Sequence, residues 1–84
     1  VSMWVARSNR RLGIGQSLVN AILDWARTQG VRTLLLMVTS NNNSAIRFYQ
    51  DLEFTMTGRT EPYPNDPALI EYEMSRPTDS RRLV

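Results

Sequence analysis

The chain has 84 residues, 42% of them hydrophobic, which is enough apolar side chain for one core and at most one domain. It contains no Cys and no His, which excludes disulfides, thiol nucleophiles, Ser/His/Asp triads and nearly every zinc site. The formal net charge is only +2, and every basic residue is Arg. The longest apolar run, 34–38, is far shorter than the roughly 20 residues of a membrane span, and no signal segment opens the chain, so we expect a cytoplasmic protein.

The first elements are predicted from hydrophobic periodicity. Apolar residues alternate over Val1 to Ala6 and predict a strand, and the polar stretch Arg7 to Gly13 predicts a loop. From Ile14 to Gln29 apolar residues recur every three or four positions, which predicts a helix that stops at Gly30. The predicted apolar stripe consists of Leu18, Val19, Ile22, Leu23, Trp25 and Ala26.

The unbroken apolar run Thr33 to Val38 predicts a strand that is covered on both faces and pairs in parallel with the first strand. Strand, helix and strand at this spacing form a βαβ unit with a right-handed crossover. The polar loop Thr39 to Asn43 offers several helix N-caps, and the apolar spacing that follows predicts a second helix ending near Leu52.

Two further strands are predicted over Phe54 to Thr60 and Ala68 to Met74, joined by a loop whose three prolines disfavour regular structure. Glu71 and Glu73 alternate with apolar residues on the last strand, so we interpret them as a solvated face, with a role in positioning an amine as the alternative. Residues 1–75 form the predicted domain, and residues 76–84 form a predicted disordered C-terminal tail.

The junction of the first strand and helix contains the motif Arg10-x-x-Gly13-x-Gly15. The first turn of a helix leaves N–H groups unpaired and carries a partial positive charge, and glycines allow a phosphate to approach the backbone. The motif is neither a Walker loop, since the chain has no Lys, nor a dinucleotide fingerprint, since Leu18 occupies the third glycine position. We therefore predict a diphosphate site, with an ordinary tight turn as the alternative.

A second motif, Asn42-x-x-Ala45-x-x-Phe48-Tyr49-x-x-Leu52-x-Phe54, follows in the expected strand and helix context. The two motifs together resemble the GNAT superfamily of acyl-CoA-dependent N-acyltransferases, over about residues 3–74. The resemblance implies an α/β fold: a GNAT-like half-domain, βαβαββ, whose mixed sheet has a parallel central pair and antiparallel C-terminal strands. It implies an N-acetyltransferase that moves an acetyl group from acetyl-CoA to an amine by direct attack, without a metal.

The resemblance also implies roles for individual residues. Val5 matches the strand residue whose backbone holds the pantetheine arm and the acyl carbonyl. Asn42 matches a polar residue that contacts the coenzyme arm, and Tyr49 matches the tyrosine that protonates the departing thiolate; an ordinary core tyrosine is the alternative. The family's pyrophosphate-binding residues correspond here to Arg10, Arg11, Gly13, Ile14, Gly15 and Gln16, and Ser17 could add a side-chain contact. We call these residues the cradle.

This chain departs from the family pattern in two respects. Glu53 stands where the superfamily has a glycine, and a left-handed backbone there would cost about 1–2 kcal/mol relative to glycine. The segments that build most of the acceptor site would precede residue 1, so we expect a homodimer or a complementing half-domain to pair with the first strand. The alternative function is a non-catalytic module that binds acyl-CoA or a partner. Nucleic-acid binding is disfavoured because the total charge is low and no aromatic platform accompanies the arginines.

Overall fold

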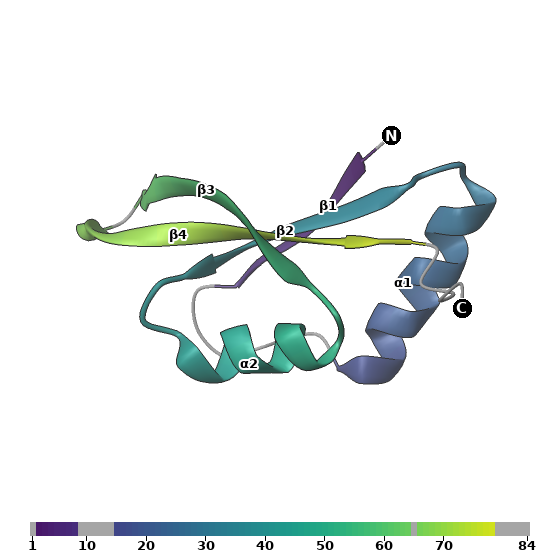
Figure 1. The fold of residues 1–84 in the computed structure, drawn as a ribbon, viewed down its shortest axis with the longest axis horizontal. Helices are drawn as coiled ribbons and strands as arrows, with labels where there is room; N and C mark the ends of the chain where they lie inside the picture. Colours follow the sequence, from purple (N-terminus) through teal and green to yellow (C-terminus); the bar gives the residue numbers. More distant parts are fainter. Residues whose placement is uncertain (1, 9–14, 65, 79–84) are drawn as a thin grey trace.

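The structure is a computed structural model, and it describes residues 2–8, 15–64 and 66–78. The predicted order of strands and helices is confirmed in this part of the chain (Figure 1). Arg10, Arg11, Gly13 and Ile14, four of the predicted cradle residues, lie outside the described residues. The elements are β1 (Ser2–Ser8), α1 (Gln16–Thr28), β2 (Thr33–Thr39), α2 (Asn43–Asp51), β3 (Thr55–Tyr63) and β4 (Asp66–Pro77).

The described strands form one mixed sheet in the order β1-β2-β4-β3. Strands β1 and β2 are parallel, and β4 runs antiparallel to both of its neighbours, β2 and β3. The predicted α/β class and the mixed sheet are therefore confirmed. The βαβ unit brings the carboxyl ends of β1 and β2 to the same edge, which is where ligands bind in open α/β sheets.

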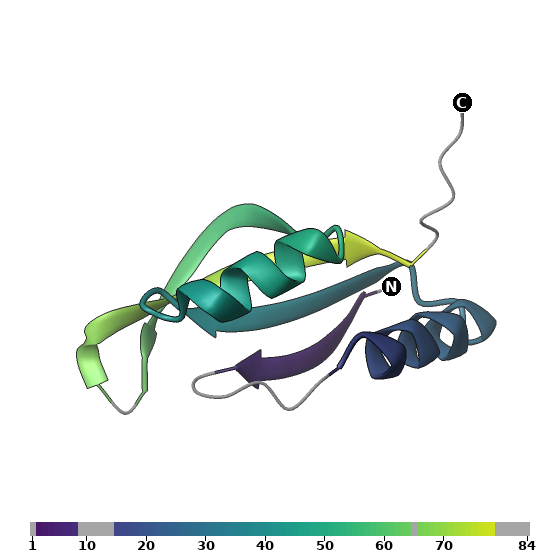
Figure 2. The same ribbon diagram turned by 90° about the horizontal axis from the view of Figure 1, so that it is seen from below.

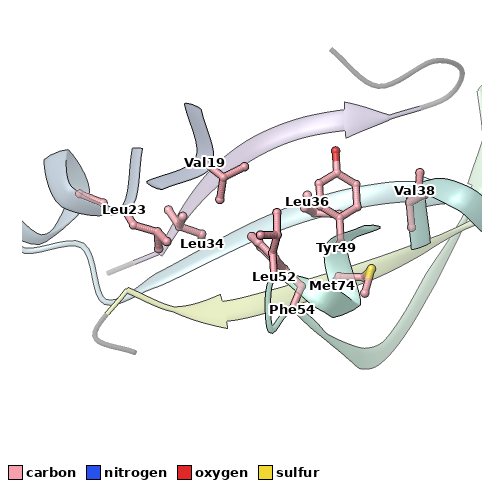
Figure 3. Packing of buried hydrophobic residues seen from close by; sticks show 11 residues of the cluster. Val19, Leu23, Leu34, Leu36, Val38, Tyr49, Leu52, Phe54 and Met74 are labelled. Atoms are coloured by element: carbon pink, nitrogen blue, oxygen red, sulfur yellow. The ribbon is translucent and has the colours of Figure 1, made fainter. Parts of the chain in front are cut away.

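Both helices pack on the same face of the sheet, as two perpendicular views show (Figures 1 and 2). This helix face of β2 contributes Leu34, Leu36 and Val38, and β4 contributes Met74 directly opposite Leu36. Figure 3 shows these side chains packed with apolar residues of both helices. The alternate residues of β2 and β4 point to the opposite face, which no described helix covers and which we call the open face.

The stripe of α1 that reaches the core is narrower than the sequence predicts. Val19, Leu23 and Ala26 are buried at the spacing of one helix face. Leu18 and Trp25, in contrast, are 48% and 54% exposed. The prediction that Trp25 belongs to the buried stripe is therefore wrong: its side chain lies beside the buried face that Val19, Leu23 and Ala26 form. Within the described residues, neither helix is long and apolar enough to cross a membrane.

The last two strands are longer than the sequence predicts. Pro62 pairs with Ile70 within the sheet, because β3 is an edge strand and a proline there loses no ladder hydrogen bond on its outer side. At the other end β4 continues to Pro77, which pairs with Thr33, and Thr78 is buried. Residues 76–78 therefore belong to the folded domain, which corrects the predicted start of the tail. Residues 79–84 lie outside the described residues.

Candidate functional site

The start of α1 is exposed, and no side chain in the described part of the chain caps it. Gly15 is the N-cap residue, with φ −88° and ψ 171°, and no described side chain accepts a hydrogen bond from the first-turn N–H groups. Gly15, Gln16 and Ser17 are all exposed. Since the first N–H groups of a helix have no intrahelical partner, this end of α1 presents donors and a partial positive charge to solvent. The three described members of the predicted cradle therefore lie together at an open helix terminus.

The glycine at position 15 is not required by the fold. Its φ is an ordinary extended value that any residue adopts, and among the described residues a Cβ added there would meet no atom within 4 Å beyond its chain neighbours. Neither its backbone angles nor packing against the described residues explains the glycine. The free space over the helix start fits an anionic group that approaches the backbone, as a diphosphate does at a helix N-terminus.

Val5 lies at an irregularity in the parallel pair of strands. Trp4 faces Leu35 and Ala6 faces Leu36, so Val5 is an extra residue without a partner on β2. A bulge of this kind locally disrupts the hydrogen-bond ladder and redirects the backbone. The structure thus interrupts β1 at the residue whose backbone the resemblance assigns to the acyl group.

Asn42 caps the second helix. Its side-chain Oδ1 accepts a hydrogen bond of 3.2 Å from the N–H of Ala45, which is the geometry of an N-cap. The sequence identified N-cap candidates in this loop, and the structure selects Asn42 among them. The start of α2 is therefore satisfied by its own residue, in contrast to the start of α1.

Tyr49 lies in the core, only 1% exposed. Its ring makes edge-to-face contacts with Phe48 and Phe54, at centroid distances of 5.5 and 5.7 Å. Figure 3 shows the hydroxyl pointing away from Phe54 and toward β1, the strand that carries the Val5 bulge. The packing orients the ring in one direction, and the hydroxyl lies in the water-poor setting that a phenol needs to act as an acid.

The turn after α2 keeps the conformation of a glycine although it contains Glu53. The φ of Glu53 is +74°, the left-handed region that favours glycine. Arg76 stabilises the turn: its Nη1 donates a 2.9 Å hydrogen bond to the carbonyl oxygen of Leu52, and its Nη2 lies 3.9 Å from Oε1 of Glu53. The sequence analysis missed Arg76, because it placed this residue in the tail.

Glu71 and Glu73 are not solvated, which corrects the prediction made from strand alternation. Glu71 is 0% exposed and Glu73 is 7% exposed, although both lie on the open face. The cause lies in β3, whose register with β4 shifts between Met56 and Thr60 and which bends across β4 (Figure 1). Through this bulge Thr57 reaches Glu73, and its Oγ1 donates a 2.8 Å hydrogen bond to Oε1 of that carboxylate.

Comparisons with known proteins agree with this architecture. The model of the acetyltransferase (GNAT) family matches residues 1–54. The chain is 33% identical over 73 residues to GCN5-related N-acetyltransferase 6, chloroplastic, from Arabidopsis thaliana, covering 84% of this chain and 25% of that protein.

Two solved structures share the fold. Ard1 from Thermoplasma volcanium superimposes with a TM-score of 0.66 at 34% identity, over 81% of this chain and 45% of that one. The protein yncA from Salmonella typhimurium, solved with its cofactor acetyl-CoA, gives a TM-score of 0.64 at 26% identity, over 84% of this chain and 42% of that one. The chain thus spans about a quarter of the curated relative and less than half of each structure. This chain belongs to the GNAT family of acetyltransferases.

Proposed function

We propose that the protein binds acetyl-CoA at the start of α1 and transfers the acetyl group to an amine. The observation that carries the proposal is the exposed start of α1, which no described side chain caps and where Gly15 leaves space that no described residue fills. Membership of an acetyltransferase family and the likeness to a protein solved with acetyl-CoA support the choice of ligand. The N–H groups of residues 15–17 would hold the pyrophosphate, together with Arg10, Arg11, Gly13 and Ile14.

The bound coenzyme supplies an activated thioester, and the residues of this chain orient and polarise it. The N–H of Val5 would donate to the acyl carbonyl oxygen, a role for which the bulge is suited because it interrupts the ladder there. The amine nitrogen forms the new C–N bond as the C–S bond breaks, and it passes a proton to water. The hydroxyl of Tyr49 would donate a proton to the departing sulfur. Asn42 would contact the coenzyme arm beside its role as a cap.

Titration calorimetry of the intact protein with CoA tests the binding half of this proposal. A free-thiol assay with acetyl-CoA and a panel of amines then tests transfer. Undetectable CoA binding would refute the proposal. Binding without thiol release for any amine would instead favour the alternative, a module that binds acyl-CoA without catalysis.

Replacement of Tyr49 by Phe tests the proton donor. The substitution preserves the ring contacts with Phe48 and Phe54, so the fold and the affinity for CoA should be retained. Turnover should fall by about a hundredfold or more, the usual contribution of a positioned general acid. Unchanged turnover in a folded variant would show that Tyr49 is an ordinary core residue.

The edge of β1 supports a second part of the proposal, that a further strand completes the sheet. Among the described strands β1 pairs only with β2, so its other edge presents unpaired backbone groups. A second copy of the chain or a complementing half-domain would supply this strand. Sedimentation of the purified chain as a compact, folded monomer at high concentration would contradict self-association.

A further inference from the structure

A groove runs along one side of α2 and contains none of the residues used in the proposed reaction. It encloses about 450 Å³, and its described lining consists of Asn43, Ser44, Arg47, Phe48 and Asp51. Residues at these spacings share one side of a helix. The buried side of α2, which holds Tyr49, lies next to it.

The direction in which this groove opens follows from the handedness of the fold. Successive residues of an α-helix are about 100° apart, so Ser44, Phe48 and Asp51 lie to one side of the buried residues. Strand–helix–strand crossovers are right-handed, which turns that side of α2 toward α1. Figure 2 shows α2 over β2 and β4 and α1 nearer β1 on the same face of the sheet. The groove therefore opens on the side of the helix at whose start we propose that the coenzyme binds.

Arg47 contributes a positive charge to the groove that no described residue neutralises. Its side chain is exposed and makes no ion pair or hydrogen bond with another described residue. Asp51 follows four positions later, but a basic residue before an acidic one is the weaker order for a helix ion pair. Ser44 lies one turn before Arg47 on the same side, so its hydroxyl and the guanidinium can both donate to one anion.

Phe48 gives the groove an aromatic surface. Its ring is half-buried and makes an edge-to-face contact with Tyr49 at a centroid distance of 5.5 Å. A ring held in this way offers its remaining surface to a flat base, since bases stack on aromatic side chains. The carboxylate of Asp51 can accept from hydroxyl or amino donors. The cation, the hydroxyl, the ring and the carboxylate together suit a nucleoside that carries a phosphate.

The two ends of CoA differ in the charge that they would bring to this groove. The pantetheine arm is uncharged, and in the proposed reaction it leads from the pyrophosphate toward Val5 and the buried Tyr49. The other end is an adenosine whose ribose carries a 3′-phosphate, and it leads away from the acetyl group. Only this end supplies an anion for Arg47.

We propose that the groove binds the 3′-phosphoadenosine end of CoA, with Arg47 and Ser44 holding the 3′-phosphate and Phe48 the adenine. Arg47 is then the residue by which the protein distinguishes CoA from 3′-dephospho-CoA. This inference rests on the proposed acetyl transfer, and it adds a specificity-determining residue to the coenzyme site.

CoA and 3′-dephospho-CoA differ only in this phosphate, and they test the inference in the intact protein. Titration calorimetry should give a dissociation constant for CoA about five to ten times lower than that for dephospho-CoA. The effect is of this size because an Arg–phosphate contact is charge-assisted but the groove is open to water. Added salt should narrow the difference, since it screens an exposed ion pair.

Substitutions then locate the effect. Arg47→Gln should abolish most of the difference by weakening the binding of CoA, while the dissociation constant for dephospho-CoA stays within about twofold. Ser44→Ala should reduce the difference less, because it removes one hydrogen bond and no charge. Arg32→Gln is the matched control: it removes the same charge from an exposed residue at the start of β2, the end of that strand remote from α2. Thermal unfolding verifies that each variant is folded.

Two results would overturn the inference. One is equal affinity for CoA and dephospho-CoA in the unmodified protein, a comparison that needs no variant to fold. The other is a difference between the two ligands that survives undiminished in Arg47→Gln. Failure of the proposed function itself is distinguishable, because neither form of the coenzyme would then bind.

Discussion

The two helices pack on the same face of the sheet, yet they are bounded by different residues at both ends. The side chain of Asn42 caps the start of α2, whereas the N-cap residue of α1 is Gly15 and no described side chain caps that helix. At the C-terminal ends the glycine and the side-chain-bearing residue are also paired in corresponding positions. Gly30 follows α1 at φ +77°, and Glu53 follows α2 at φ +74°. The glycine of α1 that the backbone requires stands at its C-terminal end. The described residues do not require the glycine at its start, and a ligand bound there would account for it.

The largest effect is expected when the start of α1 is made to resemble that of α2. Gly15→Asp places a carboxylate at the N-cap, which should cap the helix and interact favourably with its dipole, raising stability by about 0.5 kcal/mol. The same charge would repel a diphosphate, and we expect CoA affinity to fall by about a hundredfold, since apposed like charges cost several kcal/mol. Thermal unfolding and calorimetry measure the two opposite changes.

Gly15→Asn is the matched variant for this comparison. It offers a similar cap and a similar Cβ without the charge, so its CoA affinity should lie between those of the unmodified protein and Gly15→Asp. An Asp variant that binds CoA as tightly as the unmodified protein would contradict a phosphate site at this helix.

An intermediate effect is expected at the start of α2. Asn42→Ala removes the acceptor for the N–H of Ala45 and should lower the free energy of unfolding by about 1 kcal/mol. Asn42→Asp retains the cap and should keep the stability. Denaturant unfolding tests the cap. If CoA affinity nevertheless falls in Asn42→Asp, the side-chain amide also contacts the coenzyme, whereas unchanged affinity would limit Asn42 to its structural role.

The smallest effect is expected at the C-terminal ends. Glu53→Gly removes the left-handed strain of about 1–2 kcal/mol, but part of this gain is offset by the larger entropy that glycine loses on folding. We expect a net stabilisation of about 0.5 to 1 kcal/mol, measured by denaturant unfolding. Gly30→Ala should change stability in the opposite direction by about 1 kcal/mol, because alanine would be strained at a positive φ. A destabilised Glu53→Gly variant would mean that the contact with Arg76 outweighs the strain.

The order of elements and the class of sheet were predictable, because they follow from local periodicity. The alternation in β1, the apolar run of β2 and the spacing in both helices each reflect which face is buried. Periodicity does not say how far the neighbouring element extends, however. Trp25 fits the helical stripe equally well and is exposed, because its side chain lies beside the buried face of α1.

The site was predictable only in part, because two of its features depend on contacts between distant residues. Glu71 and Glu73 alternate as a solvated face would, but β3 bends across β4 beside them, and the sequence of β4, which carries both residues, shows no sign of that bend. Gly58, which adopts φ +94° within the bulge, is the one local signal that could have indicated it. Local sequence places Gly15 at a helix start, Asn42 at a helix cap and Tyr49 within a helix, and the structure confirms these positions. Their roles toward the coenzyme stay predictions.

The end of β4 connects the two helices at the ends remote from the proposed coenzyme. Arg76 binds the carbonyl oxygen of Leu52 behind α2, and Thr78 binds the carbonyl oxygens of Val31 and Arg32 behind α1 while accepting a hydrogen bond from Arg27. Two residues of this strand end, Arg76 and Thr78, therefore anchor both helices. Because this strand end holds the segments that follow α1 and α2, we expect substitutions of Arg76 or Thr78 to shift both helices relative to the sheet without altering any residue of the proposed coenzyme site.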